Sequence, residues 1–331
     1  MPSTVSVTPE RIMAVANGHW ATQILSTAAH FRFFTLIAQG HRTADALATA
    51  AGVNRHGARV LLDAAAALGF LTKHGDEYAL APDAEAFLVE DRPGNMAAML
   101  AELPNLTWSE WRHLRDAVRT GRAVVDSQST ANAEAFFGQL IRLIAPQSAG
   151  PADAVAERLA RKGLRVIDVG AGNAVWSIPF ARREAEVTAF DLPKVLKETD
   201  AIVREAGLSD RCRFVPGDLT SADFGSAAYD VAILGNICHG LSAEANRDLF
   251  TRLRRALTPA GRLVIADMVP DEQRTSPVFP VLFAVNMLLM EGTDTYTRSQ
   301  YESWLREAGL GRIEFFDTHR WHSPVIIASN Q

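Results

Sequence analysis

RVIDVGAGNAVW, residues 165–176, is the stretch that decides the fold of this chain. Its first four residues, Arg165 to Asp168, have the apolar pattern of a short buried strand. Gly170 and Gly172 then predict a tight turn, and a helix is expected to begin near Ala174. A strand, a glycine turn and a helix start are typical of the first unit of a nucleotide-binding α/β sheet. Glycines let a ligand approach the backbone closely, and the first helical turn offers N–H groups to a polar or anionic group.

An acidic residue on the next strand strengthens this interpretation. The spacing G-x-G-x-A is shorter than the G-x-G-x-x-G of a dinucleotide site, so the turn alone leaves open an α/β turn that binds nothing. Asp191 ends a second apolar strand, residues 186–190, about 20 residues further on. An acid at that position reaches two ribose hydroxyls in nucleotide-binding sheets.

Length and composition predict a two-domain globular protein. The chain has 331 residues, of which 48% are hydrophobic, which is enough for a sizeable core. Its net charge of −5 gives it no electrostatic reason to bind nucleic acid or an acidic membrane. Cys212 and Cys238 form neither a disulfide framework nor a metal site, and they fit a reducing compartment. Residues 1–10 lack signal-peptide features and no apolar run is long enough to span a membrane, so we expect a cytoplasmic location.

The N-terminal pattern predicts a winged helix. Helical periodicity runs over residues 8–39, further helices are expected at 43–52 and from Asn54 to Phe70, and residues 71–80 have the pattern of a β-hairpin. Such a domain often binds DNA, and the third helix does begin with basic residues. Its body is almost wholly apolar, however, whereas a groove-reading helix needs a solvated polar face. A dimerisation role is therefore favoured, because the long first helix has more apolar surface than this small core can cover.

Residues 83–160 are expected to be helical, with a break at 146–151 and a last helix from Ala152 to Lys162. We predict an N-terminal domain over 1–100, a helical connector over 101–160 and a C-terminal domain over 161–331. From residue 165 on, strand and helix patterns alternate, which predicts an α/β fold with a doubly wound parallel sheet. The expected strands are 165–168, 186–190, 212–215, 229–234 and 261–266, and the expected helices are 174–184, 193–207, 243–257 and 298–308. Two closing strands near 313–316 and 324–328 have no helix between them, which indicates an antiparallel pair at one edge.

A second acid follows the third strand of this sheet. Gly217 and Asp218 come after residues 213–216, and ligands in such sheets bind at the carboxyl ends of the strands. The glycine turn, Asp191 and Asp218 should therefore meet at one crevice. One acid near a ribose and another near an adenine amino group would fit a nucleoside, although Asp218 taken alone could equally be a loop cap.

These motifs carry a family resemblance over about residues 10–328. VIDVGAGNA, AFDLP, FVPGDL, LGNICHGLSAEANRDLFTRLRRAL and GRLVIADMVPDE resemble the class I S-adenosylmethionine-dependent methyltransferases. More narrowly, the chain looks like the small-molecule O-methyltransferases of plant caffeate, acetylserotonin and bacterial polyketide-tailoring type. The N-terminal domain is similar to the winged-helix dimerisation domain of that family. The resemblance implies a Rossmann-like methyltransferase sheet, S-adenosylmethionine as cofactor, S-adenosylhomocysteine as product, and a homodimer formed through the N-terminal domain.

The resemblance also implies roles for residues at the crevice. Residues from Asp168 to Gly172 would hold the methionine part of the cofactor, Asp191 would accept both ribose hydroxyls, and Asp218 and Leu219 would border the adenine. The expected cofactor-binding residues are Asp168, Gly170, Gly172, Asp191, Leu192, Gly217, Asp218, Leu219 and Asn236. No metal is expected, because no cluster of His, Asp or Glu with ligand spacing lies near Asp218 or His239.

His239 follows a strand and stands where the family keeps its catalytic base. Histidine changes its protonation near neutral pH, so it suits the removal of a phenol proton as the hydroxyl attacks the sulfonium methyl. Asp267 stands where plant members have a Glu that orients the base, and Asp294 is the only carboxylate in the segment 292–297, where those members have a second Glu. Gly235 replaces a plant lysine, and Gly240 and Leu241 replace Asp and Trp. These departures leave open transfer to carbon or nitrogen.

The acceptor pocket is expected between the helices before the sheet domain and the helix after Asp267. An aromatic and methionine lining suits a flat, apolar acceptor, while the same side chains could be ordinary core. The candidates are Trp108, Phe136, Phe137, Ile141, Phe283, Asn286, Met287 and Met290. The main hypothesis is a methyltransferase that acts on a hydroxyl of an aromatic small molecule in secondary metabolism. The alternatives are other chemistry on the same scaffold, such as decarboxylation or a pericyclic step, and a winged-helix regulator that senses a ligand and binds DNA through Arg55 and Arg59.

Overall fold

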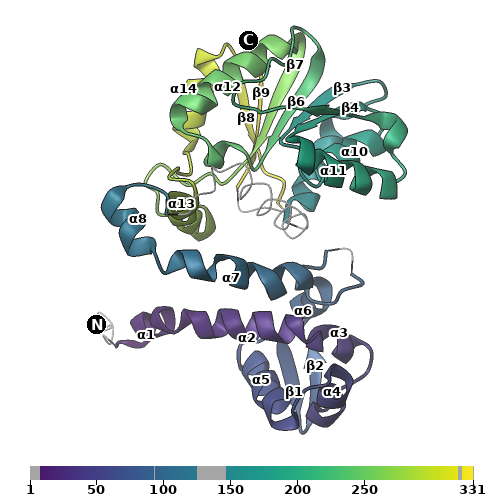
Figure 1. The fold of residues 1–331 in the computed structure, drawn as a ribbon, viewed down its shortest axis with the longest axis vertical. Helices are drawn as coiled ribbons and strands as arrows, with labels where there is room; N and C mark the ends of the chain where they lie inside the picture. Colours follow the sequence, from purple (N-terminus) through teal and green to yellow (C-terminus); the bar gives the residue numbers. More distant parts are fainter. Residues whose placement is uncertain (1–7, 93, 125–146, 320–322, 331) are drawn as a thin grey trace, which may run out of the picture. The chain divides into compact units, whose positions relative to one another are not determined.

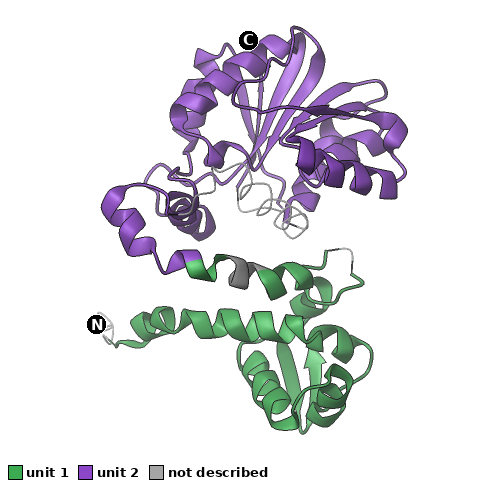
Figure 2. Ribbon diagram, viewed as in Figure 1, with its two compact units in different colours: residues 1–109 green, residues 110–331 purple. Residues whose placement is uncertain are grey.

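A computed structural model describes residues 8–92, 94–124, 147–319 and 323–330, and for residues 103–106 it describes the backbone alone. The chain forms two compact units, Met1–Ser109 and Glu110–Gln331 (Figure 2). The predicted division at residues 100 and 160 stays a prediction. Among the described residues, no helix is both long enough and apolar enough to cross a membrane.

Unit 1 has the helices and the hairpin of a winged helix (Figure 1). Its elements are α1 (Glu10–Ala16), α2 (Gly18–His30), α3 (Phe33–Ala38), α4 (Ala44–Ala51), α5 (Arg55–Ala67), β1 (Leu71–His74), β2 (Glu77–Leu80) and α6 (Pro82–Phe87), and α7 (Ala97–Trp111) runs on into unit 2. Thr43 and Asn54 cap the starts of α4 and α5 through their side chains, and Gly52 ends α4 in the left-handed conformation. The strands β1 and β2 pair antiparallel, as predicted.

The prediction of one continuous helix over residues 8–39 is wrong. The segment forms α1, α2 and α3, which are separated at Asn17 and at residues 31–32. Arg32 adopts a left-handed backbone with φ of 57°, which no helix can continue. Its side chain is held there by an ion pair with Glu90, whose carboxylate accepts a hydrogen bond of 2.8 Å from Arg32 Nε. This contact between distant residues leaves no trace in the local periodicity.

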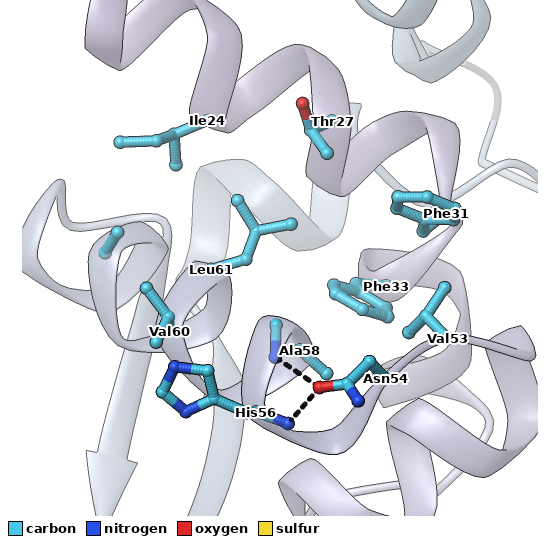
Figure 3. A pocket seen from close by; sticks show the side chains of 12 residues that line it. Ile24, Thr27, Phe31, Phe33, Val53, Asn54, His56, Ala58, Val60 and Leu61 are labelled. Atoms are coloured by element: carbon cyan, nitrogen blue, oxygen red, sulfur yellow. Dashed lines mark hydrogen bonds between the residues drawn. The ribbon is translucent and has the colours of Figure 1, made fainter.

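An open apolar groove of about 520 Å³ runs between α2 and α5. Figure 3 shows Ile24 and Thr27 of α2 facing Val60 and Leu61 of α5 across it. At one end of the groove, Asn54 Oδ1 accepts hydrogen bonds from the backbone N–H groups of His56 and Gly57. The groove is thus an apolar surface between α2 and α5, and the start of α5 is capped by Asn54.

The described strands of unit 2 form a seven-stranded sheet with the order β5-β4-β3-β6-β7-β9-β8. They are β3 (Arg165–Val169), β4 (Glu186–Asp191), β5 (Cys212–Pro216), β6 (Tyr229–Gly235), β7 (Leu257–Ala266), β8 (Arg312–Phe316) and β9 (Val325–Ser329). The first five are parallel, and β9 pairs antiparallel with both β7 and β8, which confirms the expected edge. The strand order reverses between β3 and β6, so the carboxyl ends of these two strands border the crevice where such sheets bind ligands.

Helices cover both faces of this sheet (Figure 1). The covering helices are one at 147–159, α10 (Ser177–Arg182), α11 (Pro193–Glu205), α12 (Ala243–Ala256) and α14 (Arg298–Glu307), whereas α8 (Leu114–Thr120) and α13 (Val278–Met290) lie below the ends of the strands in this view. Alternate residues of β3 belong to different cores: Ile167 packs in the cluster that contains residues of α12 and α14, and Val166 in the one that contains Phe180 of α10. This two-sided burial explains why β3 is apolar at nearly every position.

Two helix boundaries differ from the predictions. The helix expected from Ala174 begins only at Ser177, because Ala174 has a positive φ of 58° and belongs to the turn. The break expected at 146–151 is wrong for its described part, since residues 147–159 are helical and include Pro151.

Candidate active site

The glycine turn after β3 has the tight geometry that its sequence predicts. Gly170 has φ of 76° and Gly172 has φ of 49°. A Cβ atom at residue 170 would lie 2.2 Å from Cδ1 of Ile237, so only glycine fits. The N–H groups of Gly170 and Ala171 both donate to the Phe190 carbonyl oxygen, at 2.8 and 3.2 Å, which fastens the turn to the end of β4.

Asp191 is held at this turn by two backbone donors. The N–H of Gly172 donates to Oδ2 at 2.9 Å, and the N–H of Leu192 donates to Oδ1 at 2.7 Å. Burial raises the pKa of Asp191 above its usual value, and the two backbone donors oppose this shift. Each carboxylate oxygen keeps a second lone pair, so both can still accept a hydrogen bond from a neighbouring pair of hydroxyls.

Asp168 is a buried carboxylate at the end of β3. It is 1% exposed, and its Oδ2 accepts a hydrogen bond of 2.6 Å from the hydroxyl of Ser177. Burial raises the pKa of Asp168 to about 7, and the nearby charge of Asp191 adds to the shift. No ion pair with Lys or Arg is found for Asp168 within the described part of the chain. A ligand cation such as an ammonium group would therefore compensate a charge that the chain leaves uncompensated.

The Gly217–Leu219 segment lies next to Asp191, and in it the Asp218 side chain caps its own loop. Gly217 donates its N–H to the Asp191 carbonyl at 3.0 Å, and a Cβ there would lie 2.6 Å from the Phe190 ring. Asp218 is exposed, and its Oδ1 accepts from the N–H and the hydroxyl of Thr220 at 2.8 and 2.7 Å. This is the loop cap considered above, and an adenine contact for Asp218 or Leu219 stays a prediction.

Asn236 follows β6, and its buried side-chain oxygen has no hydrogen-bond partner among the described residues. Its backbone is left-handed with φ of 60°, and its N–H donates to the Ala266 carbonyl at 2.8 Å. The side-chain Nδ2 donates to Ser148 Oγ at 3.0 Å, while the buried Oδ1 has no hydrogen-bond partner. At the preceding position, a Cβ would lie 2.3 Å from Nε1 of Trp176, so the packed indole leaves room for nothing larger than Gly235.

His239 and Asp267 form a hydrogen-bonded pair at the ends of the neighbouring strands β6 and β7. The distance from His239 Nδ1 to Asp267 Oδ1 is 2.6 Å, and the backbone N–H of His239 donates to Oδ2 at 3.1 Å. The N–H of Met268 also donates to Oδ1, at 2.7 Å. The side chains are 14% and 0% exposed. Because the carboxylate only accepts, the ring proton belongs on Nδ1, and Nε2 keeps its lone pair.

The turn that carries His239 is fixed by Asn246, a residue that the sequence analysis missed. Cys238, His239 and Gly240 form a short 3-10 helix, and Asn246 Nδ2 donates to the carbonyl of Cys238 at 2.9 Å and to that of Ser242 at 3.1 Å. Asn246 is fully buried within α12. A polar residue on the apolar face of an amphipathic helix was the available signal, since a buried amide must find partners.

Asp294 lies in a different network from His239. Its Oδ1 accepts hydrogen bonds from Arg274 Nη1 at 3.1 Å and from the N–H of Thr295 at 2.8 Å. Arg274 also donates to the Thr295 carbonyl and to Gln300. In the described contacts, Asp267 is therefore the carboxylate that holds the imidazole, and the orienting role predicted for Asp294 gains no contact.

The predicted acceptor residues fall into three groups. Phe283 lies against the His239–Asp267 pair, with its ring 4.9 Å from that of His239 at 85°. On the same helix, Asn286 is half-buried, whereas Met287 and Met290 are 6% and 3% exposed and pack as core residues do. Trp108 belongs to unit 1 and is 46% exposed. Phe136, Phe137 and Ile141 lie outside the described residues.

The carboxyl edge of the sheet can thus offer carboxylates to hydroxyl and ammonium groups, and it carries a histidine with a free Nε2 lone pair. Within the described ranges, no three His, Cys, Asp or Glu side chains are grouped closely enough to hold a metal ion. The chemistry that these side chains themselves support is binding of a nucleoside-like molecule and removal of a proton from a neighbouring one.

Comparisons with known proteins agree with this arrangement. A family model for the O-methyltransferase dimerisation domain matches residues 13–90, and one for the O-methyltransferase domain matches residues 111–311. The 3-hydroxy-5-methyl-1-naphthoate 3-O-methyltransferase of Streptomyces sahachiroi is 28% identical over 96% of this chain and 92% of its own length. The tetracenomycin polyketide synthesis 8-O-methyl transferase of Streptomyces glaucescens is 30% identical over 91% of each. Human N-acetylserotonin methyltransferase, solved with S-adenosylmethionine, has the same fold, with a TM-score of 0.86 at 23% identity over 100% of this chain and 99% of that one.

Proposed function

Because this chain belongs to the O-methyltransferase family, we propose that it transfers a methyl group to a hydroxyl group of an aromatic small molecule, with His239 as the general base. The observation that carries this proposal is the 2.6 Å hydrogen bond between His239 Nδ1 and Asp267 Oδ1. That bond fixes the base in one tautomer at the carboxyl edge of the sheet, beside the glycine turn.

The chain is an S-adenosylmethionine-dependent O-methyltransferase of the kind found in secondary metabolism. An aromatic acceptor is our extension. It is supported by the names of the two Streptomyces relatives, which refer to a naphthoate and to a polyketide, and by Phe283, which places an aromatic ring beside the base.

The described residues fit S-adenosylmethionine at the crevice. Asp191 has free lone pairs on both oxygens for the ribose hydroxyls, and Asp168 has the buried charge for the ammonium group. When bound, S-adenosylmethionine supplies an electrophilic methyl group on a positively charged sulfur.

In the proposed reaction, His239 removes the proton and Asp267 stabilises the charge that results. His239 Nε2 takes the proton of the acceptor hydroxyl while the oxygen bonds to the methyl carbon and the carbon–sulfur bond breaks. The imidazolium that forms keeps its Nδ1–H on Asp267 Oδ1, so the buried carboxylate stabilises the positive charge as it develops. Phe283 limits the space around the ring from one side.

The proposal is tested by the identity of the product. The chain is incubated with S-adenosylmethionine carrying an isotope-labelled methyl group and with a panel of hydroxyarenes, and the product is analysed by NMR. We expect a labelled methyl ether, and calorimetry should detect binding of S-adenosylhomocysteine to the protein alone. A labelled methyl group on carbon or nitrogen would instead support the alternatives that the departures at Gly235, Gly240 and Leu241 leave open. Absence of binding by either form of the cofactor would reject the proposal.

The DNA-binding alternative finds no support in unit 1. Arg55 is ion-paired with Asp45, and Arg59 Nη1 lies 2.9 Å from Asp63 Oδ2. The two basic side chains that favoured a regulator are therefore partly neutralised by carboxylates of the same unit, which weakens any attraction for phosphates.

We also propose that unit 1 forms a homodimer, since the dimerisation-domain match covers its groove. Its first helices expose the large apolar side chains of Ile12, Val15 and Trp20 at 65%, 76% and 58%, and such exposure is unfavourable in water. A second copy is the occupant that satisfies both this surface and the groove. Light scattering should give twice the monomer mass, and Val15→Glu should lower it toward the monomer. A wild-type monomer at micromolar concentration would contradict the proposal.

A further inference from the structure

The first two turns of α13 carry an aromatic pair that continues outward from His239. Phe283 meets the His239 ring edge to face at 4.9 Å, and Phe279 stacks on Phe283 with ring centroids 5.8 Å apart and planes at 20°. The two phenylalanines are four residues apart, so they lie on one face of the helix, about 6 Å apart along its axis. Three aromatic rings thus form a continuous track that begins at the base.

This track leads from the interior to the surface of unit 2. His239 is nearly buried, whereas Phe279 is 40% exposed. The buried residues of α13 include Met287, Leu289 and Met290 at its far end, while Val278 and Leu282 at its start are 68% and 59% exposed. A molecule that presents a hydroxyl to His239 Nε2 would therefore extend along Phe283 toward Phe279.

We propose that Phe279 is a specificity-determining residue that selects acceptors with two fused aromatic rings. Phe283 would contact the ring that bears the reacting hydroxyl, and Phe279, one helical turn further out, would contact the second ring. A single ring held within hydrogen-bond reach of His239 ends at Phe283 and gains nothing from Phe279. This inference rests on the proposed function, because His239 defines the inner end of the track.

The test compares one-ring and two-ring phenols on the protein saturated with S-adenosylhomocysteine. Binding of 2-naphthol and of phenol is measured by calorimetry for the wild type and for Phe279→Ala. The wild type should bind 2-naphthol more tightly, and Phe279→Ala should weaken 2-naphthol about threefold to tenfold, the effect of one aromatic contact, while leaving phenol unchanged. Phe283→Ala should weaken both ligands.

Leu282→Ala is the matched control, because this exposed apolar side chain shares the turn but not the aromatic track. It should change the affinity of neither phenol. The inference is overturned if the wild type shows no preference for 2-naphthol, or if Phe279→Ala leaves the preference intact or weakens both ligands equally.

Failure of the proposed function has a different signature. In that case no labelled methyl ether forms with any hydroxyarene, whatever its number of rings. If methyl ethers form but the preference for 2-naphthol does not depend on Phe279, the inference about ring number alone is rejected.

Discussion

Replacing Asp267 by Asn probes the pair on which the proposed chemistry depends. The substitution keeps the shape of the side chain but removes its charge and turns one acceptor oxygen into a donor. Asp267 accepts three hydrogen bonds, two on Oδ1 from His239 Nδ1 and the Met268 N–H, and one on Oδ2 from the His239 N–H. The amide of Asn has one acceptor oxygen, so it can accept hydrogen bonds at only one of these two oxygen positions.

Both possible orientations of the amide in Asp267→Asn should lower the rate of methyl transfer. If the amide oxygen faces the ring, the His239 N–H loses its acceptor and the imidazolium loses its counter-charge. If the amide nitrogen faces the ring, the ring proton must move to Nε2, which can then no longer act as a base. Either arrangement should lower the transfer rate by about 10²–10⁴-fold. The unpaired buried donor should also lower the free energy of unfolding by about 1–3 kcal/mol.

The assay is single-turnover transfer of a labelled methyl group to the hydroxyarene acceptor, with urea unfolding in parallel. Asp230→Asn is the control, because that carboxylate binds Arg165 at the opposite end of β6, and its transfer rate should match the wild type. A folded Asp267→Asn protein that transfers methyl groups at the wild-type rate would refute the reasoning.

Two further predictions concern the glycine turn and the buried acid. Gly170→Ala should lower the free energy of unfolding in urea by about 1–3 kcal/mol, because the backbone there has φ of 76° and the added Cβ would lie 2.2 Å from Ile237. Gly18→Ala is the control, because a Cβ at residue 18 would meet open space and should not destabilise the chain. Equal effects of the two substitutions would contradict this reasoning. The pKa of Asp168 is raised from 3.8 to about 7, so between these pH values the folded chain keeps a proton that the unfolded chain has released. The contribution of Asp168 to the stability of the folded chain is therefore highest below about pH 4, and this contribution is lost as the pH rises through about 7. Thermal unfolding should therefore show that Asp168→Asn gains stability over the ligand-free wild type between about pH 5 and pH 8, and a pH-independent difference would argue against the shift.

Much of the sheet domain could be predicted from its sequence because its signals are local. The central strands β3, β4 and β6 contain short apolar runs, and the lack of a helix between the last two strands was enough to predict their antiparallel pairing. The breaks that the sequence analysis missed depend on tertiary contacts or on a single backbone angle. Arg32 ends α2 with the help of Glu90, 58 residues away, and Ala174 delays α10 through one left-handed residue.

The candidate site shows the same division. Asp267 was paired with His239 on the family resemblance, and the structure gives the reason: both residues follow adjacent parallel strands, β6 and β7, whose carboxyl ends meet at one edge. Asn246 was missed, although its place on the apolar face of α12 was a signal, because periodicity does not show which backbone groups a buried amide binds. Asp294 was predicted near the base from a motif position, whereas its partner is Arg274, which comes from a loop 20 residues earlier.

The single-turnover rate of His239→Ala is the most direct test of the central claim. The variant is first shown to bind S-adenosylhomocysteine with wild-type affinity, so that any change in rate belongs to the proton transfer and not to the cofactor. If His239 is the general base, the rate of methyl transfer to the hydroxyarene should fall by about 10²–10⁴-fold. A loss of less than about tenfold would contradict that role and would mean that placing the acceptor next to the sulfonium methyl is sufficient for transfer.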